Sequence, residues 1–413
     1  MSKPEKRRLE SGKAVSAALR QYYKDLWENR PLAWSVVSSN PLNDMCGVLG
    51  IQVAYPENYA CVCAAQHLSE KYCTIAEAHD YKPELCSYIR NNFGFLLDEG
   101  TEHPLGGLPE PDLLTTVSNA CLNYLKWFDA LRLHFDKPYV VINTPTRMSD
   151  EEPPDYYLEY MVREVEDAMA ELEKISGNKA TAQKLKETAH YSREQAKYWM
   201  GLLELNKAVP APLNFSDLAN LIFVPTSLSG TELGVDLLKQ AYEEVKERVK
   251  NKIGAIPDER HRLILLNIPP WYRLGLSGLF AEKGCVFPFG DYTRYVWCTQ
   301  DLDDSDPIEH FARKALAFGH TGYGSSCAET LYGSIEDRLA EDIKAYKIDG
   351  ALVQINKSCK IMSTGVLDMA TVMREKFGLP VVVLDADQAD ERFYSDAEVQ
   401  LRLDAFFEMI GEG

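Results

Sequence analysis

The sequence lacks the features that would tie it to a membrane, a secretory route or a nucleic acid. None of its apolar runs approaches the length that a bilayer-spanning helix needs. The amino terminus, MSKPEKRRLE, is charged and has no apolar segment behind it, which argues against a secretory signal. The formal net charge of −18 argues against nucleic acid, because a phosphate backbone requires a basic surface. We therefore expect a cytoplasmic protein with no membrane and no nucleic-acid partner.

Several familiar catalytic motifs are missing as well. The chain has no GxxxxGK phosphate loop, so we do not expect it to hydrolyse ATP itself, and its eight histidines form no HExxH zinc motif. No CxxC pair occurs among its ten cysteines. Ten cysteines outside a small secreted scaffold indicate a reducing compartment, in agreement with a cytoplasmic location, and not a disulfide framework.

Each half of the chain alternates short apolar strands with helical segments. A chain of 413 residues is too long for one core, and its 46% hydrophobic and 26% charged residues are typical of a globular protein. Strands are predicted at LAWSVV, IQVAY, LLTTV and PYVVIN, and again at RLILLNI, CVFPF, ALVQIN and PVVVLDA. Because strands that alternate with helices imply parallel βαβ units, we predict an α/β fold with two Rossmann-like or flavodoxin-like parallel-sheet domains.

Helical segments precede and connect these two domains. Residues 5–29 have a charged, amphipathic helical pattern, and the period stays helical from Asp155 to about Lys250 with no convincing strand. The second stretch would connect the two halves or cover them as a lid. The predicted domains are an N-terminal helical arm over 1–30, a first α/β domain over 31–150, a helical connector over 151–255 and a second α/β domain over 256–413.

Three cysteines stand out by their positions. Cys121 follows the predicted strand LLTTV and Cys359 follows ALVQIN, and each opens a predicted helix. Cys86 lies in PELCSYIRNNFG, a short helical segment that Pro83 begins. Open α/β sheets bind ligands beyond the carboxyl ends of their strands, and helix N-termini favour the thiolate form that binds metal. On spacing alone, buried small side chains remain the alternative to a shared metal site.

Four blocks of sequence resemble one known family. They are YKPELCSYIRNNFG, PEPDLLTTVSNACLNYLKWF, IDGALVQINKSCKIMS and GLPVVVLDADQADERFYS. In their order and spacing they are similar to the 2-hydroxyacyl-CoA dehydratase and class I benzoyl-CoA reductase family. The resemblance implies that Cys86, Cys121 and Cys359 are the three protein ligands of a [4Fe–4S] cluster whose fourth iron is open. We expect this cluster in the cleft between the two α/β halves.

Two further residues become catalytic candidates through this resemblance. Glu57, in AYPENYA, matches the acid/base candidate of the dehydratase branch, where the same PEN motif recurs. Ser35, in AWSVV, matches a serine that lies near the cluster and the substrate in dehydratases. We place Glu57 at a strand end that faces the cleft. The alternative is a carboxylate that balances the dipole at a helix N-terminus.

Dehydration chemistry explains why a cluster of this kind would have only three cysteine ligands. Removing water from a 2-hydroxyacyl thioester is difficult because the thioester barely acidifies the proton on the β-carbon. One electron added to the thioester carbonyl gives a ketyl radical that expels hydroxide, and the resulting enoxy radical has a far more acidic β-proton. An iron–sulfur cluster delivers such an electron, and three thiolates leave one iron free for substrate oxygen. The predicted product is an enoyl-CoA.

The resemblance also implies partners. The electron would come from a separate ATP-hydrolysing iron–sulfur activator, and the chain would pair with a related beta-type subunit to act on an acyl-CoA. Trp34, Ser35 and the PEN motif look like the substrate-binding alpha-type subunit of a dehydratase. SLSGTE, over 227–232, replaces an Arg-Gly pair of the family, which leaves the acyl group open. The alternatives are a class I benzoyl-CoA reductase subunit and a double-cubane-type electron-transfer protein, in which Cys327 or Cys298 would join a cluster.

Other chemically capable residues are interpreted as structural. Cys61 and Cys63 form a CVC pair in a helix-like context, where they face different directions and are expected to pack. The acidic residues Asp385, Asp387 and Asp390 follow a predicted strand. Such a run suits either a hard metal ion or a solvated loop. We interpret it as a solvated loop, because the family has a similar block without a dedicated metal.

Overall fold

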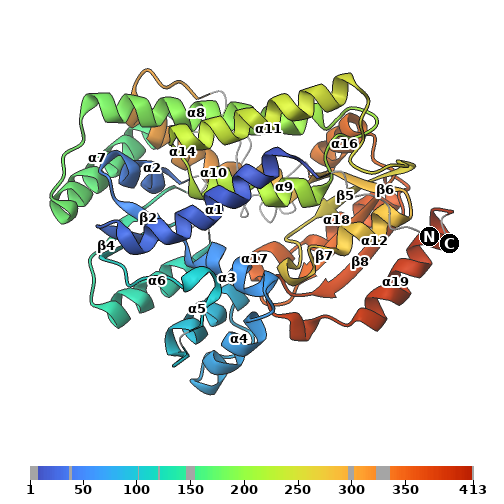
Figure 1. Cartoon of the computed structure of the whole chain (residues 1–413), viewed down its shortest axis with the longest axis horizontal. Helices are drawn as coiled ribbons and strands as arrows, with labels where there is room; N and C mark the ends of the chain where they lie inside the picture. Colours follow the sequence, from blue (N-terminus) through green and yellow to red (C-terminus); the bar gives the residue numbers. More distant parts are fainter. Residues whose placement is uncertain are drawn as a thin grey trace.

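Two four-stranded parallel sheets organise the molecule (Figure 1). The computed structural model describes residues 8–36, 40–100, 102–119, 121–145, 154–295, 302–321 and 335–411. The first sheet has the order β2-β1-β3-β4, with strands β1 (Leu32–Ser35), β2 (Gln52–Ala54), β3 (Leu113–Val117) and β4 (Tyr139–Ile142). The second has the order β6-β5-β7-β8, with strands β5 (His261–Leu266), β6 (Cys285–Gly290), β7 (Gly350–Asn356) and β8 (Val381–Ala386). The predicted α/β fold with two parallel sheets is confirmed.

The central strands of the first sheet are covered on both faces. Every residue of β1 and β3 is buried, as expected for a parallel sheet with helices on both sides. Parallel pairing aligns Ser35 with Thr115, so the carboxyl ends of β1 and β3 lie at the same edge of the sheet. The segment that carries Cys121 starts from that edge and leads into α6 (Leu122–Phe135). After β1 the chain enters α2 (Pro41–Val48), which has Asn40 at its N-cap position and proline as its first residue.

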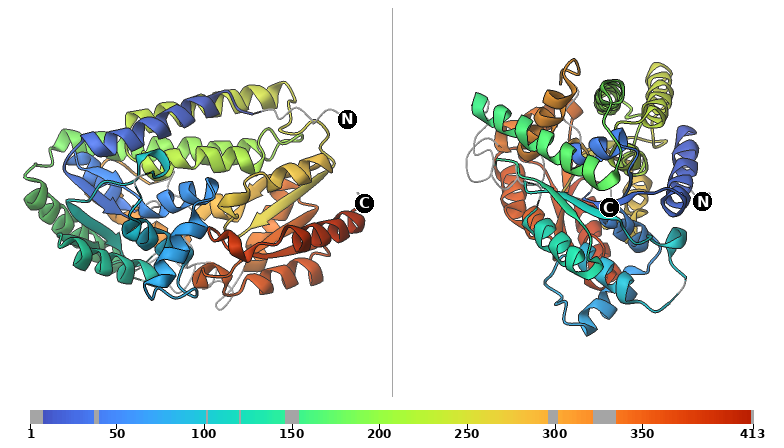
Figure 2. Two further views of the ribbon diagram at one scale, coloured as in Figure 1. Left: turned by 60° about the horizontal axis from the view of Figure 1, so that its bottom comes forward. Right: turned by 90° about the vertical axis from the view of Figure 1, so that its left-hand side faces the viewer.

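The long helices from the middle of the chain share the core of the first sheet. They are α7 (Asp155–Ser176), α8 (Ala182–Leu205) and α11 (Glu232–Lys250), with the short α9 (Phe215–Leu221) and α10 (Phe223–Ser227) between the last two. In both views of Figure 2, α8 and α11 lie side by side. Val165, Leu202 and Leu238 are buried in one hydrophobic cluster with Leu32 of β1. Within the described ranges, no helix is long and apolar enough to cross a membrane.

Two separate hydrophobic clusters cover the faces of the second sheet. On one face, α12 (Leu276–Glu282) and α19 (Asp396–Met409) contribute Phe280 and Phe406. On the other, α16 (Ile335–Tyr346) and α18 (Val366–Glu375) contribute Leu339 and Met369. The short α13 (Asp291–Tyr295) follows β6. α14 (Pro307–Thr321) leaves this half of the sequence and packs against α7 and α8, so the two halves interlock.

Three short helices beside the first sheet support the segment that contains Cys86. They are α3 (Pro56–Ala65), α4 (Ser69–Ala78) and α5 (Ser87–Leu97). A Cβ atom at Gly94 of α5 would lie 1.8 Å from the backbone oxygen of Tyr72 in α4. Only glycine therefore permits this close approach of the two helices. This contact fixes the position of α5 and therefore of Cys86, the residue just before its first turn.

Three predicted helix starts differ from the structure. α1 (Ser11–Glu28) begins later than the predicted residue 5, because the carboxylate of Glu244 accepts the backbone N–H groups of Glu10 and Ser11 at 2.9 and 2.8 Å. α5 begins at Ser87 and not at Pro83. The predicted single helix after Cys359 is two helices, α17 (Lys360–Ser363) and α18, because Gly365 between them takes a left-handed conformation with φ of 78°.

Candidate active site

The three predicted cysteine ligands all occupy the same local position, directly before the first residue of a helix. Cys86 precedes α5, Cys121 precedes α6 and Cys359 precedes α17. Backbone N–H groups of the first helical turn lower the pKa of each thiol; they belong to Tyr88 and Ile89, to Asn123 and Tyr124, and to Met362, respectively. Cysteine here occupies the N-cap position that Ser, Thr, Asp or Asn usually takes. The helix N-terminus thus favours the thiolate, the form that binds metal, and opposes the effect of burial.

The charges of the three thiols act on one another, which places them in one neighbourhood. Burial raises the pKa of the Cys86 thiol to about 12, and the charges of Asp387 and Cys121 add to that rise. Burial also raises the pKa of Cys359 well above its usual range, with the Cys86 charge as the next cause. The pKa of Cys121 is raised as well, mainly by burial. Without a cation these thiols stay protonated, whereas metal coordination deprotonates a thiol outright.

The described side chains offer no ready site for a single metal ion. In the part of the chain that the structure describes, no group of three or more His, Cys, Asp or Glu side chains is placed to hold one metal ion. A single ion needs every thiolate at about 2.3 Å from the same point. A four-iron cluster places each thiolate on a different iron, so its ligands lie further apart. A cluster therefore does not require the close grouping of donors that a single ion does.

Hydrogen bonds between the two halves hold Cys86 next to Cys359. The backbone N–H of Ser87 donates to Ser358 Oγ at 2.9 Å, and that hydroxyl donates to Asp387 Oδ2 at 2.5 Å. Ser87 follows one cysteine and Ser358 precedes the other. The bond therefore joins the two cysteine segments directly.

A buried ion pair strengthens the same junction. Arg90 of α5 donates to Asp390 at 2.7 Å, and both side chains are fully buried. Arg90 also donates to Glu77 of α4 at 2.6 Å. The interpretation of the acidic run as a solvated loop is wrong for Asp387 and Asp390, because both are buried and hydrogen-bonded. Asp385 alone is partly exposed, beside Lys357.

Glu57 lies beside the thiols but not at the predicted strand end. Pro56 starts α3, so Glu57 lies in the first turn of a helix and is buried. Burial raises the pKa of its carboxyl to about 7, against the opposing effect of a hydrogen bond from the Tyr124 hydroxyl. The charge of Glu57 in turn raises the pKa of Cys121. A carboxyl with a pKa near neutrality is suited to both accepting and donating a proton.

Ser35 is the last residue of β1, and its hydroxyl is engaged away from the cysteines. It donates to Asn43 Oδ1 of α2 at 3.0 Å and is fully buried. Among its hydrogen bonds in the described ranges, none reaches Cys86, Cys121 or Cys359. The structure therefore does not join Ser35 to the cysteine group by direct contact.

Sequence reasoning missed several residues around the thiols. Cys61, interpreted from the sequence as a packing residue, lies one turn after Glu57 on α3. Its thiol hydrogen-bonds to Tyr88, and the charge of Cys86 contributes to raising its pKa. Trp271 donates its indole N–H to the same Tyr88 hydroxyl at 2.5 Å. The sequence spacing of Glu57 and Cys61 places both on one helix face, and this could have indicated that Cys61 lies near the site. Cys298 and Cys327 lie outside the described residues.

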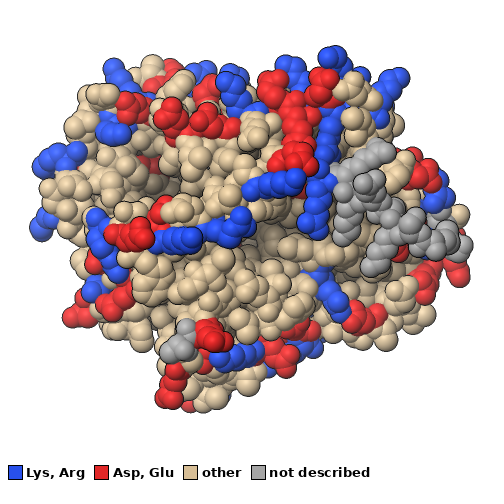
Figure 3. Space-filling view, viewed as in Figure 1, with Lys and Arg blue, Asp and Glu red and all other residues tan. Residues whose placement is uncertain are grey.

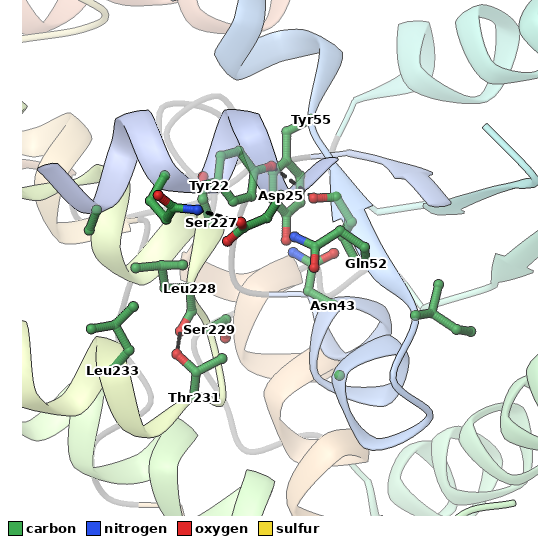
Figure 4. A pocket seen from close by; sticks show the side chains of 15 residues that line it. Tyr22, Asp25, Asn43, Gln52, Tyr55, Ser227, Leu228, Ser229, Thr231 and Leu233 are labelled. Atoms are coloured by element: carbon green, nitrogen blue, oxygen red, sulfur yellow. Dashed lines mark hydrogen bonds between the residues drawn. The ribbon is translucent and has the colours of Figure 1, made fainter. Parts of the chain in front are cut away.

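A cavity of about 230 Å³ lies close to the PEN motif (Figure 4). Tyr55 and Asn43 line it from one side and Ser227 from the other. Asn58 of the motif donates to Ser227 Oγ at 2.8 Å. The segment SLSGTE, where the sequence departs from its family, therefore forms part of this wall. Figure 3 shows a separate hollow near the middle of one face, with Lys and Arg side chains along its upper edge.

The protein is therefore an α/β protein with two parallel sheets, in which three cysteines each lie at the N-terminus of a helix. The chain belongs to the family described as 2-hydroxyglutaryl-CoA dehydratase, D-component, which it matches over residues 48–410. The (R)-2-hydroxyisocaproyl-CoA dehydratase alpha subunit of Clostridioides difficile is 30% identical, over 94% of this chain and 92% of that protein. The lactoyl-CoA dehydratase alpha subunit of Anaerotignum propionicum is 28% identical, over 92% and 90%. A benzoyl-CoA reductase subunit from Thauera aromatica is 26% identical, over 82% and 79%.

Proposed function

We propose that the chain is the substrate-binding, alpha-type subunit of a 2-hydroxyacyl-CoA dehydratase, which converts a 2-hydroxyacyl-CoA into an enoyl-CoA and water. The observation that carries this proposal is the neighbourhood of Cys86, Cys121 and Cys359 beside a carboxyl with a pKa of about 7. The similarity to dehydratase alpha subunits over nearly the whole chain supports it.

Cys86, Cys121 and Cys359 would hold a [4Fe–4S] cluster through three of its irons. When bound, the cluster would supply one electron at low potential and an open iron for substrate oxygen. The helix N-termini behind the three sulfurs offset part of the negative charge that three thiolates bring into a buried place. Part of the stabilisation of the thiolates therefore comes from the backbone itself.

Glu57 would take the proton from the β-carbon after the hydroxide has left, and would then pass that proton to the hydroxide to give water. Its pKa of about 7 leaves a large fraction of the carboxyl unprotonated at neutral pH. Tyr124 holds the carboxyl through its hydroxyl and so orients it relative to Cys121, three residues earlier in the same helix start. The general base and the thiol site are therefore held by one short segment.

The partners follow from the same relatives. Relatives named as alpha subunits imply a complex of several subunits. We expect a beta-type subunit related to this chain and a separate ATP-dependent iron–sulfur activator as electron donor. The Lys and Arg side chains at the edge of the hollow in Figure 3 would suit the phosphates of coenzyme A.

The ratio of ATP consumed to product formed tests this function. Dehydration is redox-neutral, so a protein complete with its beta-type subunit and activator should form many enoyl-CoA molecules per ATP hydrolysed. The second candidate is aromatic ring reduction, because the chain is also 26% identical to a benzoyl-CoA reductase subunit. Ring reduction leaves the electrons in the product and would consume ATP in proportion to it. Proportional consumption with an aromatic thioester, and no reaction with 2-hydroxyacyl-CoA, would overturn the proposal.

A further inference from the structure

We infer that Gln388 is a positioning residue that donates a side-chain N–H to the sulfur of Cys86 and so raises the reduction potential of the cluster. The inference rests on the proposed function, since it takes Cys86 as a cluster ligand. Gln388 lies just after β8, in the second half of the chain, whereas Cys86 lies in the first. The contact between Gln388 and Cys86 therefore forms only where the two halves pack against each other.

The amide of Gln388 lies within hydrogen-bonding distance of the sulfur, in a part-buried place. Gln388 Nε2 lies 3.7 Å from Cys86 Sγ and 3.3 Å from Ser358 Oγ. The side chain is fully buried. Its own backbone oxygen accepts the N–H of Trp271 at 3.0 Å, which fixes the main chain at this position. The amide group thus has little freedom to turn away from the sulfur.

Neighbouring hydrogen bonds decide which end of the amide faces the sulfur. Asp387 accepts the Ser358 hydroxyl at 2.5 Å and also the backbone N–H groups of Ser358, Ala389 and Asp390. Because the hydroxyl proton of Ser358 goes to Asp387, Ser358 Oγ can only accept from Gln388. The NH₂ end of Gln388 must therefore point towards Ser358 and Cys86. Its two protons serve these two acceptors.

The oxygen of the Gln388 side-chain amide also indicates a role other than packing. Gln388 Oε1 is buried and has no hydrogen-bond partner in the described part of the chain. An unpaired buried acceptor is unfavourable, so an apolar side chain of the same size would suit the fold better. What the amide provides in return is a donor to a thiolate sulfur.

A hydrogen bond to a ligand sulfur withdraws negative charge from the cluster. The reduced cluster carries one more negative charge than the oxidised one, so the bond stabilises the reduced form more. Gln388 therefore eases the transfer of an electron onto the cluster from its donor. Removing the donor while keeping the shape of the side chain should make the potential more negative.

The test compares Gln388→Met with the native chain, after anaerobic reconstitution of both with iron and sulfide. Methionine keeps the length of the side chain but has no N–H. Iron content is measured first, and the midpoint potential is then obtained from a redox titration monitored by electron paramagnetic resonance. We expect unchanged iron content and a potential shifted to more negative values. Gln400→Met, on the exposed side of α19, is the matched control and should leave the potential unchanged.

The outcomes separate this inference from the proposed function. A native chain that binds no iron would refute the cluster itself. Native iron content with an unshifted potential in Gln388→Met would overturn the role of Gln388 alone. If that variant lost its iron, the hydrogen bond can instead be tested in native protein labelled with ¹⁵N in its glutamine side-chain amides. A weak ¹⁵N coupling to the reduced cluster is expected in pulsed spectra, and its absence would overturn the inference.

Discussion

The hydroxyl of Tyr124 donates a hydrogen bond to the carboxylate of Glu57. Glu57 lies in the first turn of α3, and Tyr124 lies in the first turn of α6, three residues after Cys121. This bond connects the proposed general base to the helix start that carries one of the three thiols. It also opposes the effect of burial on the pKa of Glu57, which makes its contribution measurable.

Removing the Tyr124 hydroxyl should move the pH dependence of catalysis. The bond lowers the pKa of Glu57, so Tyr124→Phe should raise that pKa above its value of about 7. A general base works in its unprotonated form, and the rising limb of kcat/KM should therefore shift to higher pH. Tyr160→Phe, which removes an exposed Tyr–Glu bond of 3.0 Å on α7, is the control and should leave the profile in place. A profile unaltered by Tyr124→Phe would contradict this assignment.

Glu57→Gln should separate proton transfer from cluster binding. We expect full iron content but a turnover lower by roughly two to four orders of magnitude, the usual contribution of a positioned general base. Glu70→Gln is the matched control, because Glu70 is also an acidic residue in a first helical turn, that of α4. Equal activities of the two variants would assign Glu57 to a structural role at its helix N-terminus.

Cys359→Ala should lose most of the iron that the native chain binds. Two remaining thiolates hold a four-iron cluster poorly, and the native chain should bind about four iron per chain. Cys285→Ala is the control, because Cys285 is a buried thiol on β6 of the same sheet. The iron content of the native chain and of both variants is measured colorimetrically after anaerobic gel filtration. Full retention in Cys359→Ala would exclude this residue as a ligand.

Breaking the buried pair between the halves should destabilise the fold even without a cluster. Asp390→Ala removes the buried carboxylate partner of the Arg90 guanidinium, which keeps its bonds to Glu77 and the Leu85 carbonyl, and such a loss typically costs about 3–5 kcal/mol. Glu336→Ala, in an exposed pair with Lys376, should cost about 0–1 kcal/mol. Urea unfolding of the iron-free chains, followed by circular dichroism, measures both. Similar midpoints for the two variants would show that Arg90 does not hold the junction.

Local sequence patterns were sufficient to predict most of the secondary structure. Runs of Val, Ile and Leu placed the eight strands, since a strand buried on both faces has little choice of residues. Single residues end or begin helices where local backbone geometry decides, as with the left-handed Gly177 after α7 and the capping Ser395 before α19. The three cysteines were recognised through their family blocks, and each lies at a helix start. The boundaries of the four predicted domains stay a prediction.

Contacts between distant segments were beyond the reach of such patterns. Ser87 meets Ser358 across 271 residues, and Tyr124 meets Glu57 across 67. The same is true of Gln388, which is one polar residue among many until the fold brings it to Cys86. Asp387 and Asp390 look like loop residues in the sequence and are buried in the fold. A buried hydrogen bond or ion pair is favourable only once both partners have left water together, and that happens only when the two halves of the chain close on each other.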